Sequence, residues 1–286
     1  MDLRTEDKAP GLHGDTSADA MTVAAPQAKH PGVGSGLGTV ALYFLLQFGL
    51  SILVGAAVGS VLALKAGLNA GLHHQRPDVK AIAQMMRSNP DMPIVITVIT
   101  IASAAVIMAL LIRRFWPAQW SRAELPGFGF APTPNRLAYP GAVLLGFAVL
   151  LLGGAITHTL AGHHPVHQDV ALMAGKVSLD MRALLALLVV CVAPFVEELV
   201  FRGVLLSGLA SRMHIGWAML VSAIVFGCVH LPDFKFAWYP VPALILLGLV
   251  LAWLRVRTRS LWPSITLHAA NNFFAVLGWF LLTKPH

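Results

Sequence analysis

The feature that most constrains this chain is a succession of seven apolar runs, each close to the length that a helix needs to cross a membrane. They lie near 38–64, 93–113, 140–161, 183–209, 214–231, 237–254 and 261–282. Crossing a hydrocarbon core of about 30 Å takes about 20 helical residues. The runs are continuously apolar rather than alternating, which favours helices over a barrel, because backbone groups in lipid must be satisfied within the segment. The sequence therefore predicts an all-α, polytopic membrane bundle of about seven transmembrane helices.

The composition agrees with a chain whose main solvent is lipid. Hydrophobic residues make up 57% of it and charged residues only 12%, against about 25% charged in soluble domains. The net charge of +7 would suggest nucleic acid in a soluble protein, but most of these basic residues lie between the runs, where they set topology. No nucleic-acid partner is expected. The only cysteines, Cys191 and Cys228, lie inside apolar runs, so neither a disulfide framework nor a thiolate metal site is predicted.

The basic residues also predict an orientation. When the loops are assigned alternately to two sides, the side of the N-terminus collects more lysine and arginine than the other side. The bias has most weight next to helix ends, where this side carries Arg113, Arg114, Arg255, Arg257 and Arg259. We therefore predict a multi-pass protein of the inner membrane with a cytoplasmic N-terminus.

The chain divides into three parts. Residues 1–36 are polar, mixed in charge and without a signal-peptide pattern, which predicts a disordered cytoplasmic tail. Residues 37–124 are predicted to form N-terminal transmembrane helices and loops. Residues 125–283 are predicted to form the functional core, because the polar and charged residues inside apolar runs concentrate in the fourth, fifth and seventh runs.

The fourth run carries three charged residues, Glu197, Glu198 and Arg202. Each charged side chain at mid-bilayer costs about 2.5–3.5 kcal/mol by insertion scales, so they are expected to face a protein interior. Glu198 and Arg202 are four residues apart on one face, and a structural ion pair is the favoured interpretation. Glu197 is turned by about 100° from Glu198 and needs another partner.

The fifth and seventh runs add two polar pairs at four-residue spacing, Phe226 with His230 and His268 with Asn272. A single buried histidine is more often a satisfied core residue than a catalyst. Two histidines, an asparagine and a glutamate that can converge are harder to explain in that way. Counted from the N-terminal-side helix ends, their depths span roughly 10–24 Å, and a kink at Pro194 can adjust them. We predict one site, nearer the cytoplasmic side.

At these residues the sequence resembles the CAAX-protease and bacteriocin-processing (CPBP) family, which includes type II CAAX prenyl endopeptidases and bacterial Abi-like membrane proteases. That family is marked by Glu-Glu-x-x-x-Arg, Phe-x-x-x-His and His-x-x-x-Asn/Asp in successive core helices. Here these motifs are Glu197 to Arg202, Phe226 to His230, and His268 to Asn272, in the same order. The resemblance extends more loosely over about 125–282. Well-described members have eight spans, which makes eight helices the alternative to seven.

The resemblance implies an endopeptidase mechanism. Glu197 would act as general base on a water held with His230, since a carboxylate in apolar surroundings is a stronger base than one in water. His268 and Asn272 would donate hydrogen bonds to the oxyanion of the tetrahedral intermediate. The site would be supported by Glu198, Arg202 and Phe226.

A zinc site is the alternative mechanism. Two histidines and a glutamate match the ligand count of catalytic zinc, and the ligands would be Glu197, His230 and His268. The sequence has no His-Glu-x-x-His helix, and the resemblance favours a metal-free glutamate mechanism. No cofactor is therefore expected.

The function expected from these residues is hydrolysis of membrane-associated, lipidated or hydrophobic peptides, so the partners are a peptide or protein substrate and the lipid bilayer. One alternative is a non-catalytic membrane scaffold or bacteriocin-immunity protein. Another is a proton-coupled transporter, since intramembrane Glu and His also mark those. Transporter folds commonly show internal repeats and interrupted helices in matching halves, and the sequence has neither.

Overall fold

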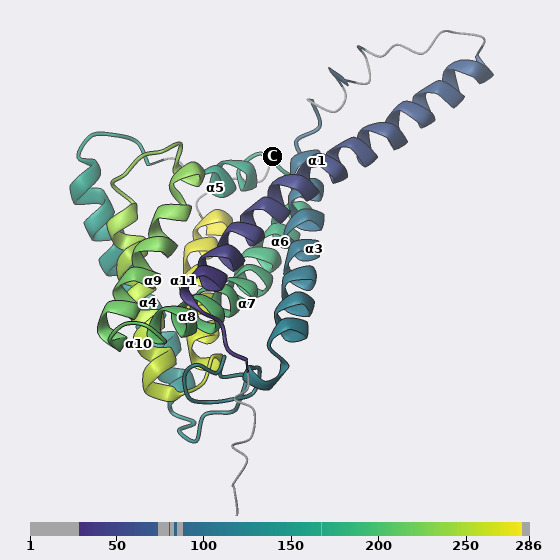
Figure 1. Ribbon diagram of the computed structural model, residues 1–286. Coiled ribbons are helices and arrows are strands. Elements are labelled where there is room, and N and C mark those ends of the chain that lie inside the picture. Colours follow the sequence, from purple (N-terminus) through teal and green to yellow (C-terminus); the bar gives the residue numbers. More distant parts are fainter. Residues whose placement is uncertain (1–28, 74–79, 81–82, 85–87, 167, 282–286) are drawn as a thin grey trace, which may run out of the picture.

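The protein is an all-helical bundle in the computed structural model, which describes residues 29–73, 80, 83–84, 88–166 and 168–281 (Figure 1). The separate long helices are α1 (Val33–Leu72), α3 (Met92–Phe115), α4 (Ala138–Ala161), α9 (Ile215–Val229), α10 (Val241–Thr258) and α11 (Trp262–Leu281). Between α4 and α9 runs one composite helix, made of α6 (Leu179–Leu187), η2 (Leu188–Val192), α7 (Ala193–Glu198), η3 (Leu199–Leu205) and α8 (Leu206–Ala210). The short elements are η1 (Pro117–Gln119), α5 (Asp169–Ala174) and η4 (Leu231–Phe234).

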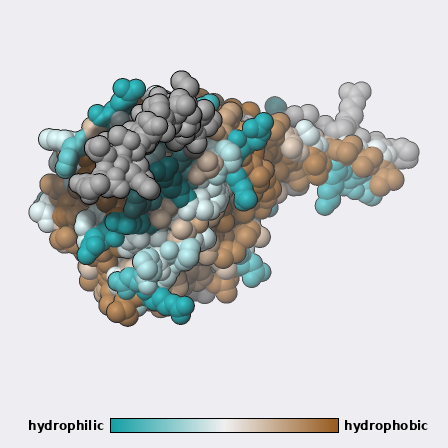
Figure 2. All heavy atoms as spheres, turned by 60° about the horizontal axis from the view of Figure 1, so that its bottom comes forward, coloured by the Kyte–Doolittle hydropathy of each residue, from teal (hydrophilic) through white to brown (hydrophobic). Residues whose placement is uncertain are grey.

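The predicted polytopic helical bundle is confirmed, and each of the seven apolar runs forms a helix. Within the described residues, five helices are long and apolar enough to cross a membrane: α1, α3, α4, the composite helix and α10. The helix α9 has only 15 residues, about 22 Å of rise. Hydrophobic side chains cover much of the outside of the bundle and of the projecting α1 (Figure 2). The chain is thus a multi-pass membrane protein.

The largest departure from the predicted boundaries concerns the first helix. The run was expected at 38–64, but α1 has 40 residues and ends at Leu72. That is about 60 Å of helix, twice the thickness of a hydrocarbon core. Its buried residues all lie near its start, from Gly36 to Tyr43, and its second half projects from the bundle (Figure 1). Of the predicted tail, residues 1–28 lie outside the described part of the chain, and helix begins already at Val33.

The composite helix forms the centre of the bundle. Every residue of η3 is buried, with α1 packed against η3 and α8, α3 against α7 and η2, and α11 against η2 and α7. Two of its turns are π-helical: the N–H of Ala193 bonds to the Leu188 carbonyl, and the N–H of Leu206 bonds to the Phe201 carbonyl, five residues back in each case. The π turn η2 stands directly before Pro194, where a kink was expected. Widened turns of this kind often occur at functional sites.

The connection between α3 and α4 is held under the bundle by a buried arginine. The guanidinium of Arg255, 1% exposed, donates to the carbonyl oxygens of Phe128 at 3.2 Å and Gly127 at 2.6 Å. Gly129 has φ +79°, and a Cβ there would lie 2.6 Å from the Arg255 Cζ. Only glycine suits both the backbone conformation and the space. This contact holds the connection against the C-terminal end of α10, and the N–H of Leu261, directly before α11, bonds to the Gly129 carbonyl at 2.8 Å.

Candidate active site

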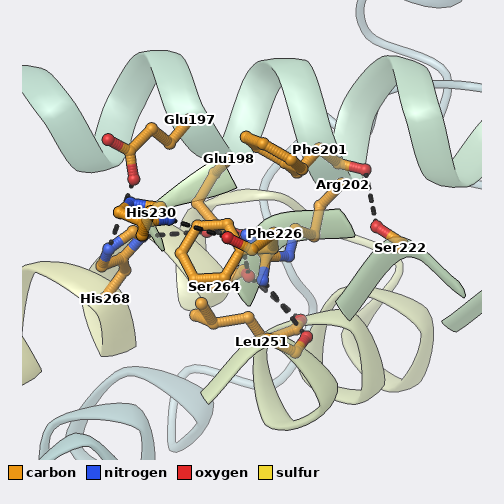
Figure 3. Close-up of polar contacts among 11 residues, drawn as sticks. Glu197, Glu198, Phe201, Arg202, Ser222, Phe226, His230, Leu251, Ser264 and His268 are labelled. Carbon is orange, nitrogen blue, oxygen red and sulfur yellow. Dashed lines mark hydrogen bonds and ion pairs between the residues drawn. The ribbon is translucent and has the colours of Figure 1, made fainter. Parts of the chain in front are cut away.

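Glu198 is completely buried and has its carboxylate oxygens fully used (Figure 3). Its Oε1 accepts a hydrogen bond from the Arg202 guanidinium at 2.8 Å and lies 3.0 Å from Nδ1 of His268. Its Oε2 accepts a hydrogen bond from the Ser264 hydroxyl. The ion pair expected from the i, i+4 spacing is present, and it is the centre of a larger network that joins the composite helix to α11.

Arg202 is likewise completely buried. Its second terminal nitrogen donates to the Gly248 carbonyl of α10 at 3.2 Å, and its Cζ lies 4.4 Å from the centroid of the Phe226 ring. A cation over an aromatic face is stabilised electrostatically, more so when it is desolvated. Phe226 therefore supports the charge of Arg202, and its ring also lies 5.8 Å from that of His268.

Glu197, the next residue around the helix, has a different environment. Its side chain is 16% exposed, and its Oε2 lies 3.7 Å from Nε2 of His268, which is longer than a hydrogen bond. Among the described residues it has no hydrogen-bond partner, and it lines a cavity. The turn of about 100° between consecutive helical residues thus separates a saturated carboxylate from one that is available to a bound molecule.

His230 is the residue that ends α9. Its Nδ1 lies 2.7 Å from the main-chain carbonyl oxygen of Phe226. A carbonyl oxygen can only accept, so Nδ1 carries the hydrogen and, in the neutral ring, Nε2 holds a lone pair. The hydrogen bond to the Phe226 carbonyl therefore fixes the tautomer of His230, which lines the same cavity as Glu197.

His268 stands between the two glutamates (Figure 3). The Glu198 carboxylate, paired with Arg202, can only accept a hydrogen bond, so Nδ1 of His268 is the donor at 3.0 Å. Its Nε2 is then the nitrogen turned toward Glu197.

Asn272 lies one turn beyond His268 and binds the main chain of the composite helix. Its amide nitrogen donates to the Val189 carbonyl oxygen at 2.9 Å. In the π turn, Val189 would bond to the N–H of residue 194, but Pro194 has none. Asn272 satisfies this carbonyl with one of its two amide hydrogens, which ties α11 to the segment just before the glutamates.

The four predicted catalytic residues, Glu197, His230, His268 and Asn272, all line one cavity of about 650 Å³. Toward its mouth the cavity is lined by Gly162 and His164 after α4 and by Pro232 and Asp233 of η4. The described connections on the N-terminal side, 116–137, 211–214 and 259–261, contribute no lining residue.

The depth of the site, expected nearer the side of the N-terminus, stays a prediction. His230 lies at the end of α9 that faces away from the N-terminal side, as expected from a run that ends near 231, and the cavity extends to the connections on that side.

The polar residues at the site that sequence reasoning missed include Ser264, Tyr43 and Gln47. Ser264 precedes His268 by four residues on one face of α11, so the i, i+4 rule could have identified it. Tyr43 and Gln47 of α1 line the cavity as well and are also four apart. They lie outside the family motifs, and nothing local distinguishes them from ordinary polar residues of a membrane helix.

The arrangement also bears on the zinc alternative. Across the part of the chain that the structure describes, no group of three His, Cys, Asp or Glu side chains is arranged to hold a metal ion. Metal independence stays a prediction.

Comparison with known proteins supports the resemblance seen in the motifs. Residues 180–274 match the family described as Type II CAAX prenyl endopeptidase Rce1-like. The chain is 30% identical over 86 residues to the "Putative membrane peptidase YdiL" of Bacillus subtilis (strain 168). That match covers 30% of this chain and 33% of the relative, about a third of its length. No solved structure matches the chain.

Proposed function

We propose that the protein is an intramembrane endopeptidase with Glu197 as its general base, and the match of residues 180–274 to the Type II CAAX prenyl endopeptidase Rce1-like family supports this. One observation carries the proposal. Glu197 faces the cavity without a hydrogen-bond partner among the described residues, while the adjacent Glu198 is saturated by three partners. A base needs an accessible lone pair, and only the first of the two carboxylates offers one.

In the proposed reaction, a water lies between Glu197 and Nε2 of His230. Because Nδ1 of His230 is held by a carbonyl, Nε2 can accept a hydrogen bond from this water and orient it. Glu197 takes a proton from the water as its oxygen attacks the peptide carbonyl carbon. The same carboxyl then gives the proton to the leaving amine when the C–N bond breaks. Proton transfer by a positioned group contributes roughly 10²–10⁴ in rate.

The oxyanion formed by that attack needs hydrogen-bond donors. We propose His268 as the first donor, through Nε2, the ring nitrogen that is turned toward Glu197 in the cavity. The second amide hydrogen of Asn272 is the other donor. In a site that excludes water, one such donor is worth about 3–4 kcal/mol.

The cavity favours a hydrophobic peptide as substrate. Besides the four candidate catalytic residues, its wall is mostly apolar, with side chains such as Val149, Leu150, Leu244 and Val276. A pocket of this kind binds an apolar segment while a few polar groups orient it. We therefore propose a membrane-embedded or lipid-modified peptide that enters extended.

The orientation of the chain decides from which side such a peptide arrives. Basic residues next to the ends of α3 and α10 favour a cytoplasmic location for the N-terminal side. The cavity mouth at η4 then lies on the outer side of the membrane. In this orientation the substrates are peptides whose scissile bond has already reached the outer half of the bilayer.

The proposal is tested by cleavage of a fluorogenic library of membrane peptides by the purified protein in nanodiscs. We expect cleavage by the wild type and none by Glu197→Gln. The matched control is Glu124→Gln, because Glu124 is 66% exposed and far from the site in an ion pair with Arg259. Wild-type protein that is folded yet cleaves nothing would contradict the proposal and favour a scaffold or immunity protein.

A further inference from the structure

The first helix supplies part of the catalytic cavity, although it lies outside the region that matches the protease family. Tyr43, Phe44 and Gln47 of α1 are among the residues that line it. Tyr43 is 1% exposed, and neither its hydroxyl nor the Gln47 amide has a hydrogen-bond partner within the described residues. Buried polar groups are normally paired, so the hydroxyl of the buried Tyr43 is available for a ligand, and the half-buried Gln47 lines the cavity beside it.

Tyr43 lies at the same level as Glu197. Gly36 packs against the backbone of Leu205, where a Cβ would be 3.2 Å from the Leu205 Cα, and α1 runs antiparallel to the composite helix. Seven residues along α1 from Gly36 lead to Tyr43, and eight residues back along the composite helix from Leu205 lead to Glu197. Both steps are about 10–12 Å. Tyr43, Glu197 and Asp233 all line the same cavity.

We propose that Tyr43 and Gln47 form the substrate-binding wall opposite the glutamates, with the Tyr43 hydroxyl donating to the carbonyl oxygen of the scissile bond. The inference rests on the proposed peptidase function. Gln47 follows Tyr43 by one helical turn, on the same face, so their Cβ atoms are about 5–6 Å apart. Two residues of an extended peptide span about 6.6 Å. The Gln47 amide, which both donates and accepts, therefore pairs with the peptide backbone about two residues from the cleaved bond.

The first test is the kinetics of Tyr43→Phe, which removes only the hydroxyl. Loss of one oxyanion donor is expected to lower kcat by about 10²-fold, with KM, thermal unfolding and the pH dependence of kcat unchanged. A shift of the pH profile would instead mean that Tyr43 acts through Glu197 and would overturn the assignment. The matched control is Tyr139→Phe, since Tyr139 lies in the first turn of α4, outside the cavity lining.

The second test measures binding without turnover. In the Glu197→Gln protein, Gln47→Leu is expected to raise the Kd of a membrane peptide about fivefold, the effect of one net hydrogen bond. If Kd and kcat are unchanged in both α1 variants while the wild type cleaves, this inference is wrong and the peptidase stands. If the wild type cleaves nothing but Gln47→Leu still weakens peptide binding, the peptidase is wrong and the binding wall stands.

Discussion

Nδ1 of His268 lies 3.0 Å from Oε1 of Glu198. This contact links α11 to the carboxylate that is held by Arg202 and Ser264, and it directs the other ring nitrogen toward Glu197. Two glutamates adjacent in the sequence therefore have different surroundings. In the proposed function they have different tasks: Glu198 positions the histidine, and Glu197 carries out the chemistry.

This division predicts that the two glutamine substitutions affect different properties, the stability of the fold in one case and cleavage in the other. Glu198→Gln leaves the buried Arg202 without its carboxylate and is expected to destabilise the fold by about 3–5 kcal/mol. Glu197→Gln, which breaks no hydrogen bond within the described residues, is expected to abolish cleavage with unfolding changed by no more than about 0.5 kcal/mol. Unfolding in detergent, followed by circular dichroism, measures both. Equal stability of the two variants would contradict this division.

The hydrogen bond from Asn272 to Val189 predicts an energetic coupling with Pro194. Asn272→Leu leaves the Val189 carbonyl unpaired and is expected to cost about 1–3 kcal/mol. In a Pro194→Ala background the restored N–H can bind that carbonyl, so the same substitution should cost less, by more than about 0.5 kcal/mol. A double-mutant cycle on unfolding tests this, with Thr266→Val as control because the Thr266 hydroxyl bonds to the Trp262 carbonyl of its own helix. Additive effects would refute the proline explanation.

The buried Arg255 predicts that Gly129 cannot be replaced. In Gly129→Ala, strain at positive φ and the clash with the guanidinium are expected to cost about 1–3 kcal/mol each. Gly141→Ala in the first turn of α4 meets nothing within 4 Å and is expected to be neutral or to stabilise by up to about 1 kcal/mol. Thermal unfolding compares them. A harmless Gly129→Ala would mean that the loop can move away from Arg255.

The proposed orientation is tested by thiol labelling of single-cysteine variants in which Cys191 and Cys228 are replaced by serine. Lys235→Cys, in the connection before α10, is expected to react with a membrane-impermeant maleimide in intact cells. Arg212→Cys, between α8 and α9, should react only after permeabilisation, because basic loops are retained inside. The reverse pattern would place the cavity mouth in the cytoplasm.

A metal-free mechanism predicts that chelation leaves cleavage unchanged. Incubation with EDTA or 1,10-phenanthroline should not reduce the rate, and added zinc should not raise it. Metal analysis of the purified protein is the independent measurement. Activity that is lost in chelator and restored by zinc would instead support a zinc site with Glu197, His230 and His268 as ligands.

The sequence predicted the helices and the polar network better than the shape around them. Long apolar runs and i, i+4 pairs are local signals, which is why the seven helices and the Glu198–Arg202 pair could be predicted. The cavity could not be. A helix that is apolar all round, such as α9, does not reveal which face is buried or where it stops, and the part of α1 that lines the site depends on the close approach of Gly36 to Leu205.

The two π turns on either side of α7 determine where the composite helix can gain or lose a residue. A π turn absorbs one extra residue locally, so the helical segments before and after it keep nearly the same rotation about the axis. Loss of one codon within Leu188–Val192 could close the turn into regular α-helix and still leave Glu197 on its side of the bundle. Loss of one codon within α7 would instead turn every later residue by about 100°. We therefore expect insertions and deletions to be tolerated unevenly along the helix, and Glu197, the proposed base, stands on a stretch whose length cannot change without turning it.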